Sequence, residues 1–446
     1  MKWTTRLINQ KVSIYPLIYF RIIWGLVTFI STIRFISLGW IEKQYLQPKF
    51  HFTYFGFEWV HPLPSSWLYA VFFLLSLSSL CIIIGWQYKL AATVFFLLFT
   101  YIELIDISYY LNHYYFVSLV SFWMILLPAH RYFSVTSFRY PNSSALEVPA
   151  WCINIIKFHI LIVYFFAGIA KINTDWLFHA LPLKIWLPAH DDMWAIGWLL
   201  KYAITAYIFS WFGMIFDIVV PFALIWKQSR VWAYVAVVIF HCISGYLFQI
   251  GVFPMVMIAS TTIFFNSKFH VAIIRYLAKL LNLKLDFNHT KPFNSISNTF
   301  TRIILPAYIV FQLLFPLRYL LYPGNLFWTE QGYRFSWRVM LMEKAGTATF
   351  YVKDRSTGRE GVVDNSEFLN LHQEKQMSFQ PDMILQYAHL LHDYYVKKGM
   401  ADPIVRAEVY VTLNGRPSQL FINPTIDLAK IKDGWNNKEW ILPYHE

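Results

Sequence analysis

Charged residues are scarce in this chain. Asp, Glu, Lys and Arg make up only 14% of its 446 residues, well below the roughly 25% of soluble domains. Hydrophobic residues make up 57% and aromatic residues 20%. Several apolar runs reach the roughly 20 residues that a helix needs to cross a bilayer. The composition therefore excludes an ordinary soluble protein and predicts a chain that crosses the membrane several times.

Cysteine is also rare. The three cysteines, Cys81, Cys152 and Cys242, all fall in or beside apolar runs, so the polar C-terminal region has none with which to form a disulfide. We expect that region to be held together by packing. The polar segment 1–11 precedes an apolar run that is long enough to stay in the membrane, which argues against a cleaved signal peptide.

Common catalytic motifs are missing as well. The sequence contains no nucleophile elbow, P-loop or dinucleotide-binding fingerprint, so phosphate and nicotinamide chemistry have no support. His389 and His392 form a pair on a predicted soluble helix, but they lack an obvious third ligand, and we expect no metal. The formal net charge of +12 fits basic loops between membrane spans, and we expect no nucleic-acid partner.

The apolar runs predict about nine membrane-spanning helices. They lie near 14–37, 66–85, 90–107, 114–128, 150–171, 197–226, 231–248, 251–266 and 300–322. Most Lys and Arg residues fall in loops on one side of the membrane if the N-terminus is cytoplasmic, and an odd number of spans then puts the C-terminus outside. The stretch 269–285 alternates apolar and cationic residues at helical spacing, so we expect it on the membrane surface.

Residues 333–446 have the composition of a soluble domain. Their alternation and periodicity predict two strands, a hairpin and a helix, at 348–352, 407–413, 414–422 and 381–398. The expected fold class is therefore an all-α polytopic membrane bundle, residues 1–332, followed by a small extracytoplasmic α+β module, residues 333–446.

Ionisable residues at membrane depth are the candidates for chemistry, because burying them is unfavourable without a partner or a task. Lys171 ends a long apolar and aromatic run at the outer end of the fifth predicted span. In a dry site, desolvation disfavours the ammonium and leaves an amine that can accept a proton. The alternative is a snorkelling lysine that only marks the end of the helix.

Two histidines are further candidates. His113, next to Asn112, opens the fourth span on the same outer side as Lys171, so these residues could share one cavity. His241 lies within the seventh span, near Ser244. Each histidine also fits a structural role, as an interfacial residue or as a core residue hydrogen-bonded to neighbouring helices.

One segment resembles a known signature. The residues from Tyr164 to Trp176 are similar to the signature of the vitamin K-dependent gamma-glutamyl carboxylases. Similar segments follow nearly end to end, including His61–Pro64, Asn112-His113, Phe240–Cys242, Gln249–Phe253 and Tyr333–Met340. The resemblance implies an enzyme that uses reduced vitamin K (the hydroquinone) as cofactor, with O2 and CO2 as co-substrates.

The family reaction implies a role for each candidate. Lys171 would deprotonate the hydroquinone, and reaction with oxygen would give a base that removes the γ-proton of a glutamate. Carbon dioxide would then give γ-carboxyglutamate, with vitamin K epoxide as co-product. His113 would act with Lys171 in catalysis. The cofactor would be bound by Asn112, Tyr164 and His241, and the peptide by Tyr333 and Trp337.

The chain also departs from the animal members. It ends soon after the first soluble module, it lacks the cysteines of their inter-domain disulfide, and Gly332, Met342 and Lys344 differ from their residues. A compact, cysteine-poor chain suits a prokaryotic plasma membrane. The expected partners are membrane lipid and a glutamate-containing peptide or protein. Two alternatives remain: a hydroquinone epoxidase that does not carboxylate protein, and a non-catalytic membrane protein that binds quinone or lipid.

Overall fold

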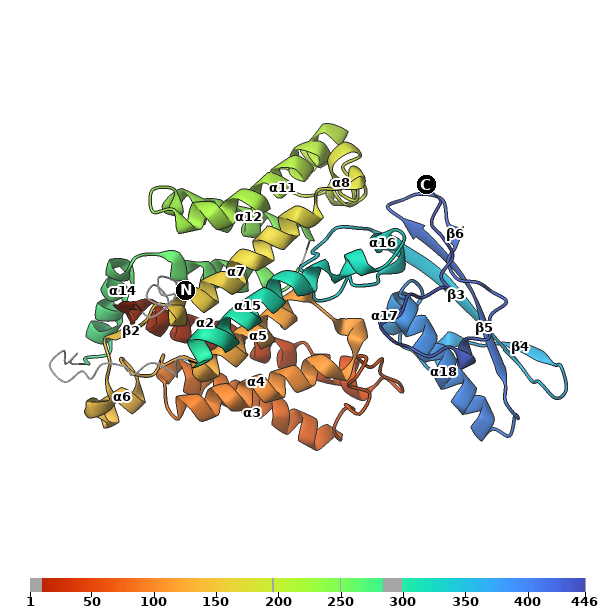
Figure 1. Cartoon of the computed structure of the whole chain (residues 1–446), viewed down its shortest axis with the longest axis horizontal. Coiled ribbons are helices and arrows are strands. Elements are labelled where there is room, and N and C mark those ends of the chain that lie inside the picture. Colours follow the sequence, from red (N-terminus) through yellow and green to blue (C-terminus); the bar gives the residue numbers. More distant parts are fainter. Residues whose placement is uncertain (1–9, 195, 249, 284–298, 446) are drawn as a thin grey trace.

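The computed structural model describes residues 10–194, 196–248, 250–283 and 299–445. Figure 1 shows a long helical bundle, with a domain of strands and helices packed against one of its ends. The fold class predicted from the sequence, a polytopic helical bundle followed by a small α+β module, is confirmed.

Seven helices in the described part of the chain are long and apolar enough to cross a membrane. They are α2 (Tyr15–Ser37), α3 (Ser65–Ile84), α4 (Tyr88–Ile105), α7 (Trp151–Ala170), α11 (Ala203–Ile225), α12 (Arg230–Phe248) and the helix Phe300–Leu321, which contains α15 (Leu305–Leu314). An eighth span results if α13 (Phe253–Thr261), its continuation to Phe264 and α14 (Ser267–Leu280) are taken together, although they meet at 113°.

The described residues thus give seven candidate spans, or eight with the bent pair, rather than the nine expected. α5 (Asn112–Leu126) has only 15 residues, fewer than the roughly 20 of a full span. It nevertheless crosses the bundle: its start is bonded to the segment before the C-terminal domain, and the loop after it is bonded to Arg21, near the N-terminus. α13 is short as well, with nine residues.

Two other sequence expectations are refined. The span expected at 197–226 begins later, because 197–200 forms the separate short helix α10 (Gly197–Leu200). Lys201 then lies exposed between the two helices, with its Nζ 3.2 Å from Asp191. The amphipathic stretch forms helix α14, which buries His270, Ile274 and Ala278 on one face. The last two residues of that stretch, 284 and 285, lie outside the described residues.

Small residues let the bundle helices approach closely. A Cβ on Gly25 of α2 would lie 2.9 Å from the Ser79 carbonyl oxygen of α3, so only glycine permits this contact. One turn later, Thr28 and Ser79 share a hydrogen bond of 3.2 Å between their hydroxyl oxygens. Such small and hydroxylated residues are typical of helix contacts in membranes.

The C-terminal domain is a four-stranded antiparallel sheet in the order β4-β3-β5-β6. Its strands are β3 (Lys344–Lys353), β4 (Glu360–Val362), β5 (Ile404–Leu413) and β6 (Gln419–Leu420). Alternate residues of β5, from Val405 to Leu413, are buried, as expected for a strand with one covered face. The covering helices are α17 (Leu371–Met377) and α18 (Pro381–Lys397). The strands and the helix expected from the sequence are thus confirmed.

The two parts share a core at their junction. Trp328 of the short helix α16 (Leu326–Thr329) is buried against Phe421, with 5.0 Å between ring centroids. Phe52 and Tyr54, from the loop before α3, are buried in the same cluster. The connection Gly332–Met342 between this junction and β3 therefore lies between the membrane bundle and the soluble domain.

Candidate functional site

Lys171 faces the protein interior at the end of α7. Its side chain is buried, and Nζ lies 2.8 Å from Oδ2 of Asp217 on α11. The amine also donates to the Ala167 carbonyl at 3.3 Å and lies 5.3 Å from the ring centroid of Trp176. The snorkelling alternative is therefore not what the structure describes, because a snorkelling amine reaches outward to water.

Two glycines make room for this pair. A Cβ on Gly168 would lie 2.7 Å from Ile218 Cγ1 and 2.9 Å from the Ile218 backbone nitrogen, so the close contact of α7 with α11 requires glycine there. A Cβ on Gly213 would lie 4.0 Å from Cε of Lys171, which is an ordinary contact. Gly168 therefore sets the distance between the helices that carry Lys171 and Asp217.

Trp176 packs beside the lysine, with 5.3 Å between Nζ and the ring centroid. Asn173 caps the short helix α8 (Thr174–Phe178) by accepting a 2.9 Å hydrogen bond from the Trp176 amide. The indole nitrogen of Trp176 donates to the Ser210 carbonyl at 2.8 Å, and the Ser210 hydroxyl donates to the Trp176 carbonyl. The indole is thus tied to α11 beside the ion pair.

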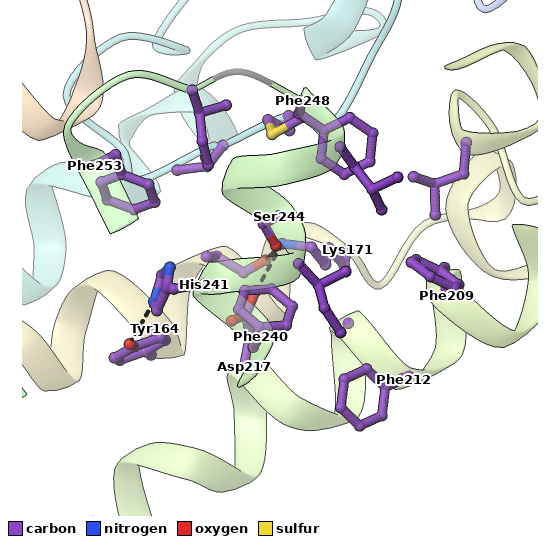
Figure 2. A pocket seen from close by; sticks show the side chains of 18 of the residues that line it. Tyr164, Lys171, Phe209, Phe212, Asp217, Phe240, His241, Ser244, Phe248 and Phe253 are labelled. Carbon is purple, nitrogen blue, oxygen red and sulfur yellow. Dashed lines mark hydrogen bonds and ion pairs between the residues drawn. The ribbon is translucent and has the colours of Figure 1, made fainter. Parts of the chain in front are cut away.

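The ion pair lines a cavity of about 250 Å³, the inner cavity, between α7, α11 and α12. Figure 2 shows Lys171 and Asp217 in it, with Tyr164 and His241 nearby. Tyr164 Oη and His241 Nε2 are 2.8 Å apart. His241 is buried, and its Nδ1 has no hydrogen-bond partner among the described residues. Most other lining residues are apolar, including Phe212, Phe240 and Phe253.

One wall of the inner cavity is also part of the bundle surface. Ile208 and Phe212 of α11 line the cavity and are 59% and 52% exposed, and Ile243 of α12 is 41% exposed. Apolar side chains on the outside of a membrane bundle face lipid. The cavity therefore borders the hydrocarbon region between α11 and α12.

A second cavity of about 470 Å³, the outer cavity, adjoins the soluble domain. Asn112 and His113 line it, together with Tyr333, Arg334 and Arg338. Asn112 is fixed at both ends of its amide: Nδ2 donates to the Arg338 carbonyl at 2.8 Å, and Oδ1 accepts from the Tyr110 hydroxyl at 3.1 Å. His113 makes no hydrogen bond with another described residue.

Lys171 and His113 therefore line two neighbouring cavities rather than the single one considered from the sequence. Phe253 separates them: its ring centroid lies 5.7 Å from that of His113 and 5.5 Å from that of His241. Ile250, Val339 and Met340 also border both cavities. The partition between the two cavities consists of the Phe253 ring and these few aliphatic side chains.

The segment Gly332–Met342 has an unusual backbone. Phe335, Trp337 and Met340 have φ values of 58°, 59° and 53°, a region that non-glycine residues rarely adopt. Such conformations cluster at functional sites. Trp337 is wholly buried and stacks on Tyr115, with centroids 4.9 Å apart. It lines neither cavity, whereas Tyr333 lines the outer one.

Two family models match nearly the whole chain. The model of the HTTM domain matches residues 9–269, and that of the vitamin K-dependent gamma-carboxylase lumenal domain matches residues 297–446. The chain belongs to the vitamin K-dependent gamma-carboxylase family. No solved structure matches the chain.

Membership of the carboxylase family implies reduced vitamin K as cofactor. The inner-cavity residues Tyr164, Lys171 and His241 fall within the first match, and Tyr333 and Trp337 fall within the second. Within the described ranges, no group of three or more His, Cys, Asp or Glu side chains could hold a metal ion. That the reaction needs no metal stays a prediction.

The sequence analysis missed two residues that line these cavities, Asp217 and Arg338. Asp217 is an acidic residue inside an apolar span, and that position alone marks it as a candidate. Arg338 gave no comparable signal, because its segment follows neither helical nor strand periodicity. Its side chain is buried, with the guanidinium carbon 4.3 Å from the ring centroid of Tyr319. Burial lowers the pKa of Arg338, but an arginine keeps its charge at neutral pH.

Proposed function

We propose that this protein is a vitamin K-dependent gamma-glutamyl carboxylase. It would couple oxidation of vitamin K hydroquinone to the epoxide with carboxylation of a glutamate in a peptide or protein. The observation that carries the proposal is the Lys171–Asp217 pair, at 2.8 Å, in an apolar cavity that borders lipid.

The inner cavity fits the ring system of this cofactor. Its volume of about 250 Å³ lies just below the roughly 300–1,000 Å³ of sites that hold a whole drug-sized ligand. It therefore suits the fused rings, while the isoprenoid tail extends past Ile208 and Phe212 into the bilayer. The unpartnered Nδ1 of His241 is available to a ring hydroxyl, and its partner Tyr164 holds the imidazole in place.

Lys171 and Asp217 together supply the proton acceptor. With one shared proton the pair is neutral overall, whether the proton lies on Nζ or on Oδ2. When the proton is on Asp217, the Lys171 amine is free to take a second one from the cofactor hydroxyl. The pair then carries one positive charge, and the deprotonated cofactor beside it carries one negative charge. The cavity as a whole stays neutral. A low-dielectric site favours this balance, because an uncompensated charge would be strongly destabilised there.

Water exclusion is the second requirement. When bound, reduced vitamin K supplies electrons to oxygen and with it the base that removes the glutamate γ-proton; hydroquinone and O2 become epoxide and water, and CO2 adds to the glutamate carbon. Water near such a base would quench it by giving up a proton. Trp176 and the aromatic residues of the inner cavity shield Lys171 from the outer face.

The outer cavity would receive the peptide. Tyr333 lines it, and the C-terminal domain contributes Gln376, Phe379 and Gln380. Asn112 fixes the backbone at Arg338, and His113 stands at the partition, against Phe253. A glutamate side chain in this cavity lies next to Val339 and Met340, which border the inner cavity as well. Trp337 would support this segment from behind.

The decisive experiment separates the two products. Purified protein in lipid nanodiscs receives vitamin K hydroquinone, oxygen, labelled bicarbonate and a glutamate peptide, and epoxide and fixed label are assayed separately. We expect both products from the wild type and neither from Lys171→Met, which removes the amine but keeps much of the side-chain volume. A matched control is Lys184→Met, an outer lysine that bonds the Tyr207 hydroxyl at 2.9 Å; it should keep both activities.

Each other outcome points elsewhere. Epoxide without fixed label would identify a hydroquinone epoxidase and reject protein carboxylation. If the wild type binds the hydroquinone but forms neither product, the protein is a non-catalytic quinone-binding protein.

A further inference from the structure

Arg338 is a buried cation without a counter-ion. Only 8% of its surface is exposed, and no described Asp or Glu forms an ion pair with it. The ring of Tyr319 covers one face of the guanidinium, with 4.3 Å between its carbon and the ring centroid. Nε is buried and has no hydrogen-bond partner in the part of the chain that the structure describes. Buried charges are normally paired, so this guanidinium calls for an anion from outside the chain.

The neighbouring carboxylates are already used. Asp382 forms an ion pair with Arg334, and Glu330 lies 2.8 Å from Nζ of Lys344. The charged residues that line the outer cavity are three arginines, Arg34, Arg334 and Arg338, and one acid, Glu330. Because Arg334 and Glu330 are paired elsewhere, the described lining presents a net positive charge to whatever enters the cavity.

Arg338 lies where cavities meet. Arg338 is a lining residue of the outer cavity and of a side cavity of about 430 Å³, which Asn173 and Tyr319 also line. Its carbonyl is held by Asn112, 2.8 Å away. The next two residues, Val339 and Met340, form part of the partition in front of the inner cavity. An anion held by Arg338 is therefore beside the wall behind which Lys171 lies.

We propose that the guanidinium of Arg338 binds the side-chain carboxylate of the substrate glutamate. This inference rests on the proposed function and assigns its substrate carboxylate to one residue. A guanidinium fits a carboxylate with two parallel hydrogen bonds. Removing the γ-proton next to a carboxylate builds up a second negative charge, and a fixed cation at that carboxylate stabilises it.

The side cavity offers a competing occupant. Its rim includes Ile172 and Leu320, which are 56% and 68% exposed, so a lipid could reach Arg338 with an anionic headgroup. The outer cavity is the better route for the ligand, because it is flanked by the soluble domain and carries the net positive charge. A peptide arriving from outside the membrane meets this cavity first.

The test measures peptide binding without cofactor, so that it does not depend on catalysis. Wild type, Arg338→Gln and Arg338→Lys are placed in phosphatidylcholine nanodiscs, and binding of a glutamate peptide is compared with that of its glutamine counterpart. We expect Arg338→Gln to raise the Kd of the glutamate peptide about ten- to a hundredfold, the range for a lost charged hydrogen bond, and to leave the glutamine peptide unaffected. Arg338→Lys keeps the charge but loses the planar group that can donate two parallel hydrogen bonds, so its Kd for the glutamate peptide should lie between the other two.

Arg139→Gln is the matched control. Arg139 also lies over a tyrosine ring, that of Tyr140, with 5.7 Å to the centroid, but at the opposite end of the bundle. Its removal changes the net charge equally and should leave both peptides bound as in the wild type. Thermal melts of all variants check folding. If Arg338→Gln does not fold, Arg338→Lys decides: an unchanged Kd for the glutamate peptide would then overturn the proposal.

The outcomes separate this inference from the proposed function. In the product assay, Arg338→Gln should raise the KM for the glutamate peptide, whereas the control Arg139→Gln should leave this KM and both product yields as in the wild type. If the wild type forms neither product but Arg338 still discriminates glutamate from glutamine, the proposed function fails and the carboxylate site stands. If both peptides bind Arg338→Gln as they bind the wild type, the inference is wrong. If Arg338→Gln is less stable than the wild type in nanodiscs with phosphatidylglycerol but not in those with phosphatidylcholine alone, Arg338 binds a lipid headgroup instead.

Discussion

At the scale of single residues, the central feature is a buried ion pair between two membrane helices, α7 and α11. Lys171 and Asp217 are both buried, and their atoms Nζ and Oδ2 are 2.8 Å apart. A buried pair of this kind adds little stability relative to apolar residues of similar size, yet losing one partner is strongly destabilising because the other charge stays behind. A buried pair in an apolar wall therefore agrees better with the proposed proton transfer than with a role in folding stability.

This asymmetry gives the first prediction. Asp217→Ala should lower the free energy of unfolding by about 3–5 kcal/mol, because it leaves a buried ammonium without its partner. The double variant Lys171→Met/Asp217→Leu should recover most of that loss while forming no epoxide. Asp217→Asn, which keeps the volume but cannot accept a proton, should slow hydroquinone oxidation more than it weakens hydroquinone binding. Unfolding in detergent and the separation of kcat from KM measure the two effects.

An exposed ion pair provides the control. Lys201 and Asp191 lie 3.2 Å apart, and their side chains are 59% and 49% exposed. Water and ions screen such a pair, so Asp191→Ala should change stability by less than about 1 kcal/mol. If the double variant is no more stable than Asp217→Ala, the unpaired ammonium of Lys171 is not what destabilises Asp217→Ala.

At the scale of elements, the site depends on how closely α7 and α11 approach. Gly168 faces Ile218 at a distance that leaves no room for a Cβ, since 2.7 and 2.9 Å are far below ordinary contacts. The obstacle at 2.9 Å is backbone, which cannot rotate aside. Any side chain at this position must therefore push the two helices apart, and Lys171 moves with one of them while Asp217 moves with the other.

The second prediction uses two glycines on these helices. Gly168→Ala should separate α7 from α11, lengthen the Lys171–Asp217 contact and reduce epoxide formation at least tenfold, with a loss of stability of about 1–3 kcal/mol from overpacking. Gly213→Ala is the matched control, because its Cβ would meet Trp176 at 3.8 Å and Lys171 at 4.0 Å. It should keep most of the activity. Equal losses in both variants would show that helix propensity or cavity volume, and not the helix contact, controls the reaction.

The elements themselves were largely predictable from the sequence. Long apolar runs give the spans, and alternation gives β3 and β5, because burial of one face or stripe imposes a period on the chain. The start of α11 was misplaced, since the apolar run continues through α10 and hides the break at Lys201. The segment Gly332–Met342 could not be predicted, because its positive φ values are imposed by tertiary packing and leave no periodic pattern.

The candidate site was predictable only in part, for the same reason. Tyr164, Lys171 and His241 were found on helices and do line one cavity. Their relation to His113 was not accessible, since a partition made by Phe253 depends on how α13 packs against α5 and α12. Arg338 was missed because an arginine in a polar segment looks ordinary until the structure buries it.

At the scale of the whole molecule, the C-terminal domain forms hydrogen bonds and an ion pair with the segment that follows Lys171. Arg416 in the β5–β6 turn forms an ion pair with Asp175 at 2.5 Å, and Asn414 donates to the same carboxylate at 2.6 Å. Burial opposes ionisation of Asp175, but these hydrogen bonds outweigh it and hold its pKa below the ordinary value. Trp186 adds a bond to Glu343, also 2.5 Å long. The C-terminal domain thus holds in place the segment whose residues Trp176 and Trp186 line the inner cavity.

The charge distribution makes the last prediction, which concerns orientation. Helices α6 (Val135–Arg139) and α14 lie at the end of the bundle that is remote from the C-terminal domain (Figure 1). Basic residues are frequent in and beside these two helices, namely Arg131, Arg139, Lys268, Arg275 and Lys279. The other end also carries basic residues outside that domain, but some of them, including Lys171 and Arg338, are buried in the protein. By the positive-inside rule we expect the end with α6 and α14 to be cytoplasmic, and both the outer cavity and the C-terminal domain then face away from the cytoplasm.

Cysteine labelling in intact cells tests this orientation. In a background with Cys242→Ser, which removes the exposed native thiol, Ser356→Cys in the exposed β3–β4 turn should react with a membrane-impermeant maleimide. Asn142→Cys, exposed in the loop before α7, should react only after the membrane is opened. The remaining cysteines, Cys81 and Cys152, are buried and serve as the unlabelled baseline. The reverse pattern would turn the outer cavity toward the cytoplasm, and a peptide substrate would then have to reach Arg338 from inside the cell.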